Sequence, residues 1–245
     1  MKKLFTSTLI PFATCVSLVM ASSARASVRG DSIGVKFGAD QPLPDGSRLS
    51  PTAVAGVPGV ESANWNNADG PSDSLDNIVR DTHGVPTTTG ASVIWSTTNT
   101  FTSGSNDNFR GDDHTLMLGY LDQNADAAPI RVRFIGLPDD FEIYDVYVYF
   151  LGSNAHRGGV YRLNGVSFGE VSQFGFVGVE DTGPAYIDAA ELVPPAKGNY
   201  VVFRGLSGRT IDISADNDID NRSPINAIEI VNTTHTSESS RLIPK

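Results

Sequence analysis

Short stretches in which apolar and polar residues alternate recur along the chain, and they predict β-strands. Residues 33–37, 130–134 and 211–214 alternate with a period of two, which gives each strand one apolar and one polar face. Residues 146–150 are apolar on both faces, as expected of a central strand that is covered on both sides. Further candidate strands lie at residues 92–96, 115–121, 160–163, 200–206 and 225–231.

Clusters of Gly, Pro, Asn and Asp separate these stretches, and no run of ten or more residues has a capped helical stripe. The pattern predicts an all-β fold: an antiparallel β-sandwich (jelly roll) of about ten or more strands with little or no helix. We expect one domain over residues 27–231, followed by a flexible polar tail at 232–245.

Composition and charge limit the classes of function. The apolar fraction of 40% is that of a globular chain and excludes wholesale disorder. The chain carries 18 Lys and Arg against 28 Asp and Glu, a formal net charge of −10. Since an acidic surface repels phosphate backbones, we expect no nucleic-acid partner.

The N-terminal segment is typical of a signal peptide. Lysines at 2–3 precede a mostly apolar stretch over 4–20, and Ala-Arg-Ala at 24–26 matches the small-x-small cleavage pattern. Removal of residues 1–26 also removes Cys15, so the mature chain has no cysteine and no disulfide. No second apolar stretch is long enough to span a membrane, and we expect a secreted or periplasmic protein.

Two strands carry a resemblance to a known superfamily. Residues 224–231 (Pro-Ile-Asn-Ala-Ile-Glu-Ile-Val) resemble the last strand of malectin-like and related galactose-binding-type β-sandwiches, and residues 144–150 are similar to a central core strand there. The overall pattern, including residues 62–67, also resembles secreted planctomycete-type bacterial proteins of unassigned function. The resemblance implies a jelly-roll module of a kind that often binds carbohydrate.

Aromatic residues next to amides suggest a polysaccharide or glycan as partner. The C–H face of a sugar ring stacks on indole or phenol rings, while Asn and Arg side chains bind its hydroxyls. Trp65 stands among three asparagines, where it serves either as a core anchor or as a ligand platform. Tyr147 and Tyr149 share one strand face, for packing or for binding. The predicted ligand-binding residues are Trp65, Asn66, Asn154, His156, Arg157 and Tyr161.

Alternating carboxylates in a loop raise the possibility of a structural calcium ion. Asp216, Asp218 and Asp220 follow a D-x-D-x-D pattern that can bring three side chains around one hard cation. The pattern is not an EF-hand, because Asn221 and Ala227 stand where that loop needs Gly and Glu. A solvated acidic turn is the alternative.

Signals for catalysis are weak, and we assign no catalytic residue. Residues 165–169 match the G-x-S-x-G pattern, but they lie between two predicted strands with no helix, so we interpret Gly165 and Gly169 as hairpin glycines. The four histidines do not pair at zinc-ligand spacing. Candidate acid pairs for hydrolysis of a glycosidic bond come from Asp112, Asp122, Glu142, Asp145 and Glu170.

Three functions are compatible with these sequence features. The first is an exported glycan-binding β-sandwich, with or without a structural calcium ion. The second is an extracellular or envelope structural or adhesion protein with no small ligand. The third is a polysaccharide hydrolase or lyase, which requires a cleft with at least one carboxyl group of strongly shifted pKa. We favour the first, a binding function, over the enzymatic third, and the sequence leaves the question of catalysis open.

Overall fold

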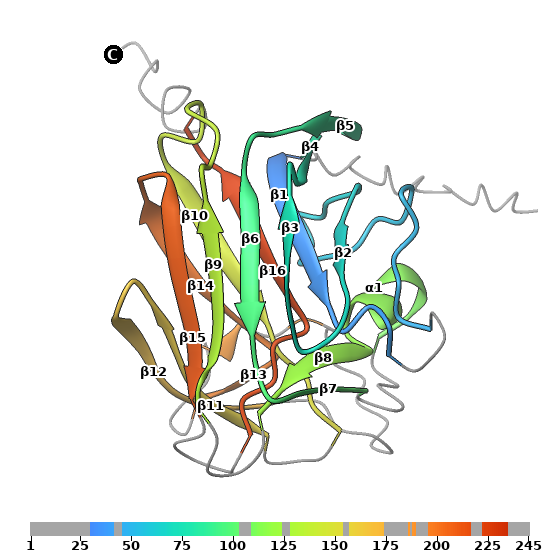
Figure 1. Ribbon diagram of the computed structural model, residues 1–245, viewed down its shortest axis with the longest axis vertical. Helices are drawn as coiled ribbons and strands as arrows, with labels where there is room; N and C mark the ends of the chain where they lie inside the picture. Colours follow the sequence, from blue (N-terminus) through green and yellow to red (C-terminus); the bar gives the residue numbers. More distant parts are fainter. Residues whose placement is uncertain are drawn as a thin grey trace, which may run out of the picture.

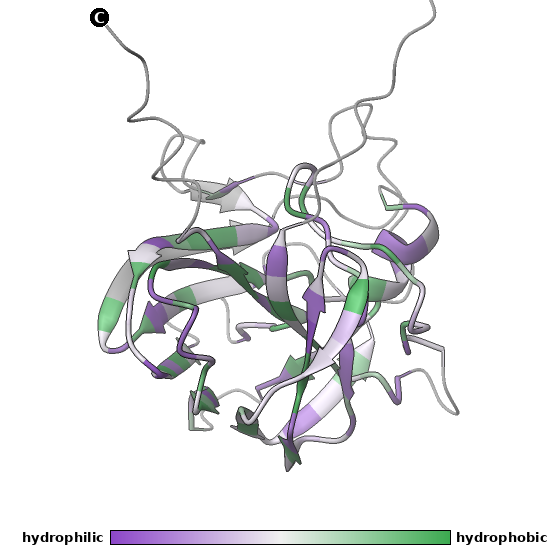
Figure 2. Cartoon of the chain, turned by 90° about the horizontal axis from the view of Figure 1, so that it is seen from above, coloured by the Kyte–Doolittle hydropathy of each residue, from purple (hydrophilic) through white to green (hydrophobic). Residues whose placement is uncertain are grey.

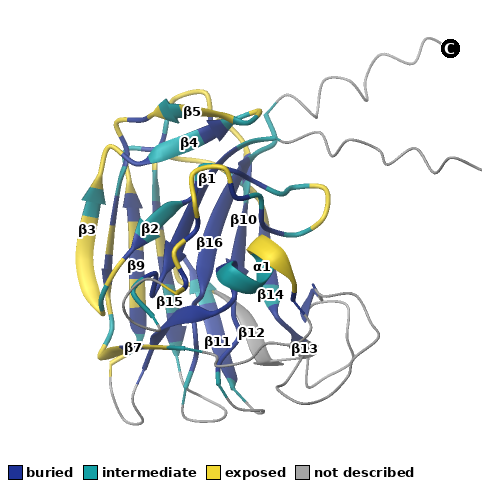
Figure 3. Cartoon of the chain, turned by 90° about the vertical axis from the view of Figure 1, so that its right-hand side faces the viewer, coloured by how far each residue is buried: buried dark blue, intermediate teal, exposed yellow. Residues whose placement is uncertain are grey.

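Two mostly antiparallel sheets pack face to face in a computed structural model of the protein, as predicted (Figure 1). The side view in Figure 3 separates the two layers and places helix α1 against the first sheet, on the side away from the second. No helix in the described part of the chain is long and apolar enough to cross a membrane. The structure describes residues 30–41, 46–102, 109–123, 128–153, 157–173, 186, 188–189, 196–216 and 222–234.

The first sheet has seven strands and contains both the first and the last strand of the fold. β1 pairs with β16 and β4, β10 pairs with β14 and β16, and β2 lies parallel to β1. In spatial order the strands are β14 (Tyr200–Leu206), β10 (Tyr144–Tyr149), β16 (Ala227–Asn232), β1 (Asp31–Phe37), β4 (Val79–Thr82) and β5 (Val85–Thr88), with β2 (Asn66–Ala68) beside β1.

The second sheet also has seven strands. The chain crosses between the sheets at each step from β9 to β11 and from β13 to β16, the connectivity expected of a jelly roll. In spatial order the strands are β13 (Ala196–Gly198), β12 (Val166–Gln173), β11 (Gly158–Leu163), β15 (Thr210–Asp216), β9 (Ile130–Ile135), β6 (Ser92–Ser96) and β3 (Ser72–Asp76). A separate pair consists of β7 (Asn99–Thr102) and β8 (Gly119–Asp122).

The main core lies between the two sheets. Because side chains alternate along a strand, Ile33, Val35 and Phe37 of β1 point toward the second sheet. Val132 and Phe134 of β9 point toward the first sheet and pack in the same core. Figure 2 shows this alternation as bands of hydrophobic and hydrophilic residues along the strands. The predicted strands 33–37, 130–134 and 211–214 are confirmed, and their apolar faces form this core.

The first sheet is buried on its outer face as well. Val146 and Val148 of β10 belong to the core between the sheets, whereas Tyr147 and Tyr149 point the other way and are also buried. A cover made of the segment 46–65 and α1 (Gly111–Leu116) lies over them. The prediction that residues 146–150 form a central strand covered on both sides is therefore confirmed.

Trp65 packs between the cover and the first sheet. Its ring packs edge-on to Tyr149 with centroids 6.3 Å apart, and its indole N–H donates to the carbonyl of Ser62 at 3.0 Å. The ring lies directly on Gly34 of β1, where an added Cβ would come within 2.5 Å of it. Gly34 therefore provides the space that Trp65 occupies.

One predicted strand, 115–121, is wrong over its first half. Thr115 and Leu116 end α1, and the strand β8 begins only at Gly119. Leu116 and the following Met117 are both fully buried in the cluster between the cover and the first sheet. Leu and Met are good helix formers, so local preference and packing against that sheet both favour the end of a helix here.

We expect Gly34→Ala to destabilise the protein, because the new methyl group would overlap the buried ring of Trp65. Overpacking of this kind costs about 1–3 kcal/mol. Urea or thermal unfolding measures the loss. Gly90→Ala is the matched control, since a Cβ at Gly90 meets nothing within 4 Å, and it should leave the midpoint almost unchanged. Equal stability of the two variants would contradict the packing of Trp65 on Gly34.

Candidate functional site

The aromatic residues predicted to bind a ligand lie inside the protein. Trp65 is 5% exposed in the cover, and Tyr161 is fully buried between the sheets, where its hydroxyl donates to the carbonyl of Pro224 at 2.7 Å. The two rings thus lie on opposite sides of the first sheet. Since neither ring presents a face to solvent, the structure places Trp65 in the core-anchor role and gives Tyr161 a packing role.

The two described polar residues of that prediction, Asn66 and Arg157, have separate partners. The amide of Asn66 donates to the carbonyls of Gly34 and Val79, which ties β2 to its neighbours. Arg157 lies near Asp122, and its charge opposes the rise that burial causes in the pKa of that carboxyl group. Asn154 and His156 lie outside the described residues.

The calcium prediction involves one described residue. Asp216, at the end of β15, lies 3.6 Å from the guanidinium of Arg162, and Asp218 and Asp220 lie outside the described residues. Among the residues that the structure describes, no group of three or more His, Cys, Asp or Glu side chains is placed to hold a metal ion. The calcium site stays a prediction.

The G-x-S-x-G segment forms part of a β-hairpin. Asn164 and Gly165 make the two-residue turn between β11 and β12, with φ of 49° and 80°, as a type I′ turn requires. The amide oxygen of Asn164 accepts the backbone N–H of Asp212 at 2.8 Å, which fixes the turn to β15. Gly165 is therefore a turn glycine, as interpreted from the sequence.

An open hollow of about 390 Å³ lies on the outer face of the second sheet, over β6, β9 and β15 and beside this turn. In Figure 1 these three strands run side by side at the front of the molecule. We call this surface the arginine face and define it by its outward side chains: Ile94, Ser96, Arg131, Arg133, Asp212 and Ser214.

Strand register places these side chains in two rows across the sheet. Arg133 stands between Ile94 on β6 and Asp212 on β15. Arg131 stands in the next row, between Ser96 and Ser214. Successive outward residues of one strand are about 6.6 Å apart, so Arg131 and Arg133 can both line the same hollow.

The two arginines differ in their partners. Arg133 forms an ion pair with Asp212 at 3.4 Å, and both side chains are more than half exposed. The guanidinium of Arg131 has no ion-pair or hydrogen-bond partner among the described residues. Ile94 adds apolar surface, since its side chain is 46% exposed. The face thus combines an unpaired cation, hydroxyl groups and one exposed apolar side chain.

A second hollow, of about 280 Å³, lies at the end of the sandwich beside Arg80 and Arg209. Here the cations already have partners: Arg80 pairs with Asp140 at 2.7 Å and Asp31 at 3.4 Å, and Arg209 pairs with Asp139 at 2.9 Å. Because both cations of this hollow are already paired, we expect it to bind an anion more weakly than the arginine face.

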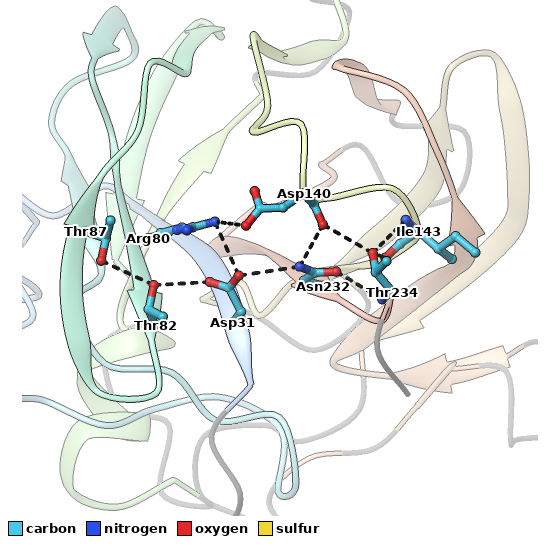
Figure 4. Close-up of polar contacts among 8 residues, drawn as sticks. All are labelled: Asp31, Arg80, Thr82, Thr87, Asp140, Ile143, Asn232 and Thr234. Atoms are coloured by element: carbon cyan, nitrogen blue, oxygen red, sulfur yellow. Dashed lines mark hydrogen bonds and ion pairs between the residues drawn. The ribbon is translucent and has the colours of Figure 1, made fainter. Parts of the chain in front are cut away.

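Figure 4 shows the network around Arg80, which we call the terminal clasp: Asp31, Arg80, Asp140 and Asn232. The amide of Asn232 donates to Asp31 at 3.4 Å and to the carbonyl of Asp140 at 3.1 Å. Burial raises the pKa of Asp31, and the charge of Arg80 acts against this rise. The clasp joins the start of β1 to the end of β16, which is a structural role.

The most strongly perturbed carboxyl group lies under the cover. Glu229 of β16 is fully buried, and it accepts hydrogen bonds from the hydroxyls of Ser62 and Tyr149, the latter at 2.6 Å. Burial raises its pKa from 4.5 to about 8; these two hydrogen bonds oppose the rise, and the charges of Glu61 and Asp81 add to it. Glu229 links the cover to the sheet.

Carboxylates of α1 join the helix to the segment 46–65 within the cover. Asp112 accepts the backbone N–H of Val54 at 2.8 Å. Asp113 accepts the N–H of Gly56 at 2.9 Å and the hydroxyl of Tyr186 at 2.8 Å. Burial raises the pKa of Asp113 despite these bonds. Asp112, proposed from sequence as one member of a catalytic pair, thus satisfies a backbone group of the cover, as its neighbour does.

A lysine is buried on the same face of the sheet. Lys36 is 0% exposed, and its ammonium donates to the carbonyls of Phe37 at 2.6 Å and Gly119 at 2.5 Å. Burial holds its pKa well below the ordinary value. Its contacts connect β1 with β8, so this residue also supports the fold.

Comparisons with known proteins add little to this description. No family model and no curated protein matches the chain. Among solved structures, the chain is similar to a calcium-binding mutant of Bacteroides uniformis beta-glucuronidase 2, with 12% identity and a TM-score of 0.40. The match covers 84% of this chain and 18% of that chain. A likeness at this level carries no argument about the function of the chain.

We expect Glu229→Gln to flatten the pH dependence of stability. Between pH 4.5 and about 8 the folded chain keeps a proton on Glu229 that the unfolded chain has released, so the free energy of unfolding falls as pH rises through this window. Each pKa unit corresponds to about 1.4 kcal/mol. Between the low and the high end of this pH range, the free energy of unfolding of the variant should therefore rise by a few kcal/mol relative to that of the wild type.

Urea unfolding at pH 5, 6.5 and 8 measures this difference. Other groups that titrate in the same range cancel in the comparison, because both proteins carry them. Glu142→Gln, which removes an exposed carboxylate, is the control and should follow the wild type. A constant difference between Glu229→Gln and wild type at all three pH values would show that Glu229 does not titrate in this window.

Proposed function

We propose that the protein is an exported glycan-binding β-sandwich whose ligand surface is the arginine face. The observation that carries the proposal is the open hollow over β6, β9 and β15, in which Arg131 has no partner among the described residues. Hydroxyls, an exposed isoleucine and guanidinium groups are the chemistry that binds a sugar chain with many hydroxyl groups.

The two faces of the sandwich support this choice of surface. The outer face of the first sheet lies under the cover, so a ligand cannot reach its aromatic residues. The outer face of the second sheet carries the polar side chains predicted from the alternation in residues 130–134 and 211–214. An extended polymer can lie across such an exposed sheet.

The geometry favours binding over hydrolysis. A carboxyl group of strongly shifted pKa is present, as the hydrolase hypothesis requires, but Glu229 is 0% exposed and sits beneath the cover. The arginine face contributes the carboxylate Asp212, which already pairs with Arg133. Two carboxyl groups facing each other across an open cleft are the requirement of a glycosidase, and these two lie on different sheets.

Export and calcium belong to the same proposal. The segment 1–26 directs export, and a calcium ion at Asp216, Asp218 and Asp220 stabilises the loop after β15. We expect calcium to raise the melting temperature of the wild type relative to EDTA, and Asp218→Ala to abolish that rise. An identical rise in wild type and variant would exclude this loop as the site.

Affinity electrophoresis against a panel of neutral and acidic polysaccharides tests the binding function. We expect retardation by at least one polymer with no release of reducing sugar. Ile94→Asp should weaken that binding by about tenfold or more, because it replaces the exposed apolar group of the hollow with a charge. Ile143→Asp is the matched control, since Ile143 is similarly exposed, at 42%, outside the face.

Equal weakening by Ile94→Asp and Ile143→Asp would move the ligand away from the arginine face. Retardation by no polymer in the panel would contradict the binding function itself. Release of reducing sugar by the wild type would favour the hydrolase hypothesis.

A further inference from the structure

We infer that the glycan is acidic, and that Arg131 binds the carboxylate of a uronic acid residue on the arginine face. This inference rests on the proposed function and adds the class of ligand. It is built from the partners of the charged groups in the hollow, the side chains beside Arg131 and the charge of the surrounding surface.

The charged groups of the hollow leave one cation available. Arg133 is held by Asp212 at 3.4 Å, an exposed pair that neutralises itself. Arg131, one row away, faces the same hollow without a partner in the described part of the chain. A guanidinium binds a carboxylate through two parallel N–H···O bonds, and such charge-assisted bonds are stronger than those between neutral groups.

The neighbours of Arg131 suit a sugar acid. Ser96 and Ser214 stand directly across from it on β6 and β15. Their hydroxyls both donate and accept, so they can bind the hydroxyl groups and the ring oxygen of a sugar whose carboxylate lies on Arg131. Ile94 in the adjacent row offers an apolar contact to the C–H groups of the ring.

The hollow favours a charged sugar over a neutral one. Binding of neutral sugars depends largely on stacking against aromatic rings. Trp95, the aromatic residue among those lining the hollow, is 2% exposed and packs inward against Phe37. The described lining therefore provides no aromatic platform, and the guanidinium of Arg131 is the strongest contact on offer.

Charge selects a carboxylated chain rather than a densely sulfated one. On β6, β9, β11 and β15 the charged side chains are Arg131, Arg133, Arg162, Asp212 and Asp216, a surplus of one positive charge within these four strands. The whole chain carries −10. A polymer with closely spaced sulfates would gain one ion pair and meet repulsion from the surrounding acidic surface. A uronic acid chain carries a lower charge density.

Isothermal titration with four polymers tests the inference: polygalacturonate, its methyl ester, a neutral β-glucan and dextran sulfate. Methyl esterification removes the carboxylate charge and leaves the sugar backbone unchanged. We expect polygalacturonate to bind and its ester to bind about tenfold or more weakly, as loss of a charge-assisted hydrogen bond implies. Added salt should weaken the binding of the acid form.

The variant Arg131→Gln should lose the preference for the acid over the ester. Its expected loss of affinity for polygalacturonate is about tenfold to a hundredfold, with little change for the ester. Arg204→Gln is the matched control, because it removes the same charge from an exposed arginine of the first sheet, where Arg204 pairs with Asp145 at 3.2 Å. Thermal melting confirms that both variants fold.

The outcomes separate this inference from the proposed function. Equal affinity for acid and ester, or tighter binding of the β-glucan, would overturn the acidic ligand and leave glycan binding intact. Tighter binding of dextran sulfate would overturn the choice of a carboxylate. Equal losses in Arg131→Gln and Arg204→Gln would show that general charge, and not Arg131, attracts the polymer. Absence of binding to all four polymers would count against both proposals.

Discussion

Burial of the first sheet on both of its faces is the constraint on which the rest of the structure depends. One face packs against the second sheet, and the other lies under the cover formed by the segment 46–65 and α1. The second sheet packs on one side only, which leaves its outer face exposed. The division into a structural sheet and an accessible sheet follows from where the cover lies.

The same constraint explains the polar groups inside the protein. Because the outer face of the first sheet is covered, the polar residues Lys36 and Glu229 on that face are buried as well. A buried polar group without a partner is costly, so each of these two is hydrogen bonded to the cover or to a neighbouring strand. The contact of Glu229 with Ser62 gives the cover a defined position, and the contact of Lys36 with Gly119 fixes β8 to β1.

The sequence predicted the strands more completely than the contacts of individual side chains. Alternation predicted the strands of the sandwich, and an uninterrupted apolar run predicted the double burial of residues 146–150, because both signals are local. The prediction of a strand at residues 115–121 failed over its first half. There a helix ends, and Leu116 and Met117 pack on the first sheet. The role of Trp65 depends on Gly34, about thirty residues away, and no local pattern shows that contact.

The arginine face illustrates the same limit. The alternation in residues 130–134 already put Arg131 and Arg133 on the exposed side of a strand, which was the signal available to find them. The rings of Trp65 and Tyr161, which the sequence analysis predicted to bind a ligand, are buried in the structure. The pairing of strands remained hidden, since only register shows that Asp212 neutralises one arginine and not the other.

The terminal clasp has a mechanical consequence. β1 and β16 are antiparallel neighbours, and the start of one lies beside the end of the other. A pulling force applied through those two ends would act along the interstrand hydrogen bonds, which lie perpendicular to the strands, and would open them one after another. Asp31, Asn232, Arg80 and Asp140 sit where that peeling would begin, so they would be the first contacts to bear the load.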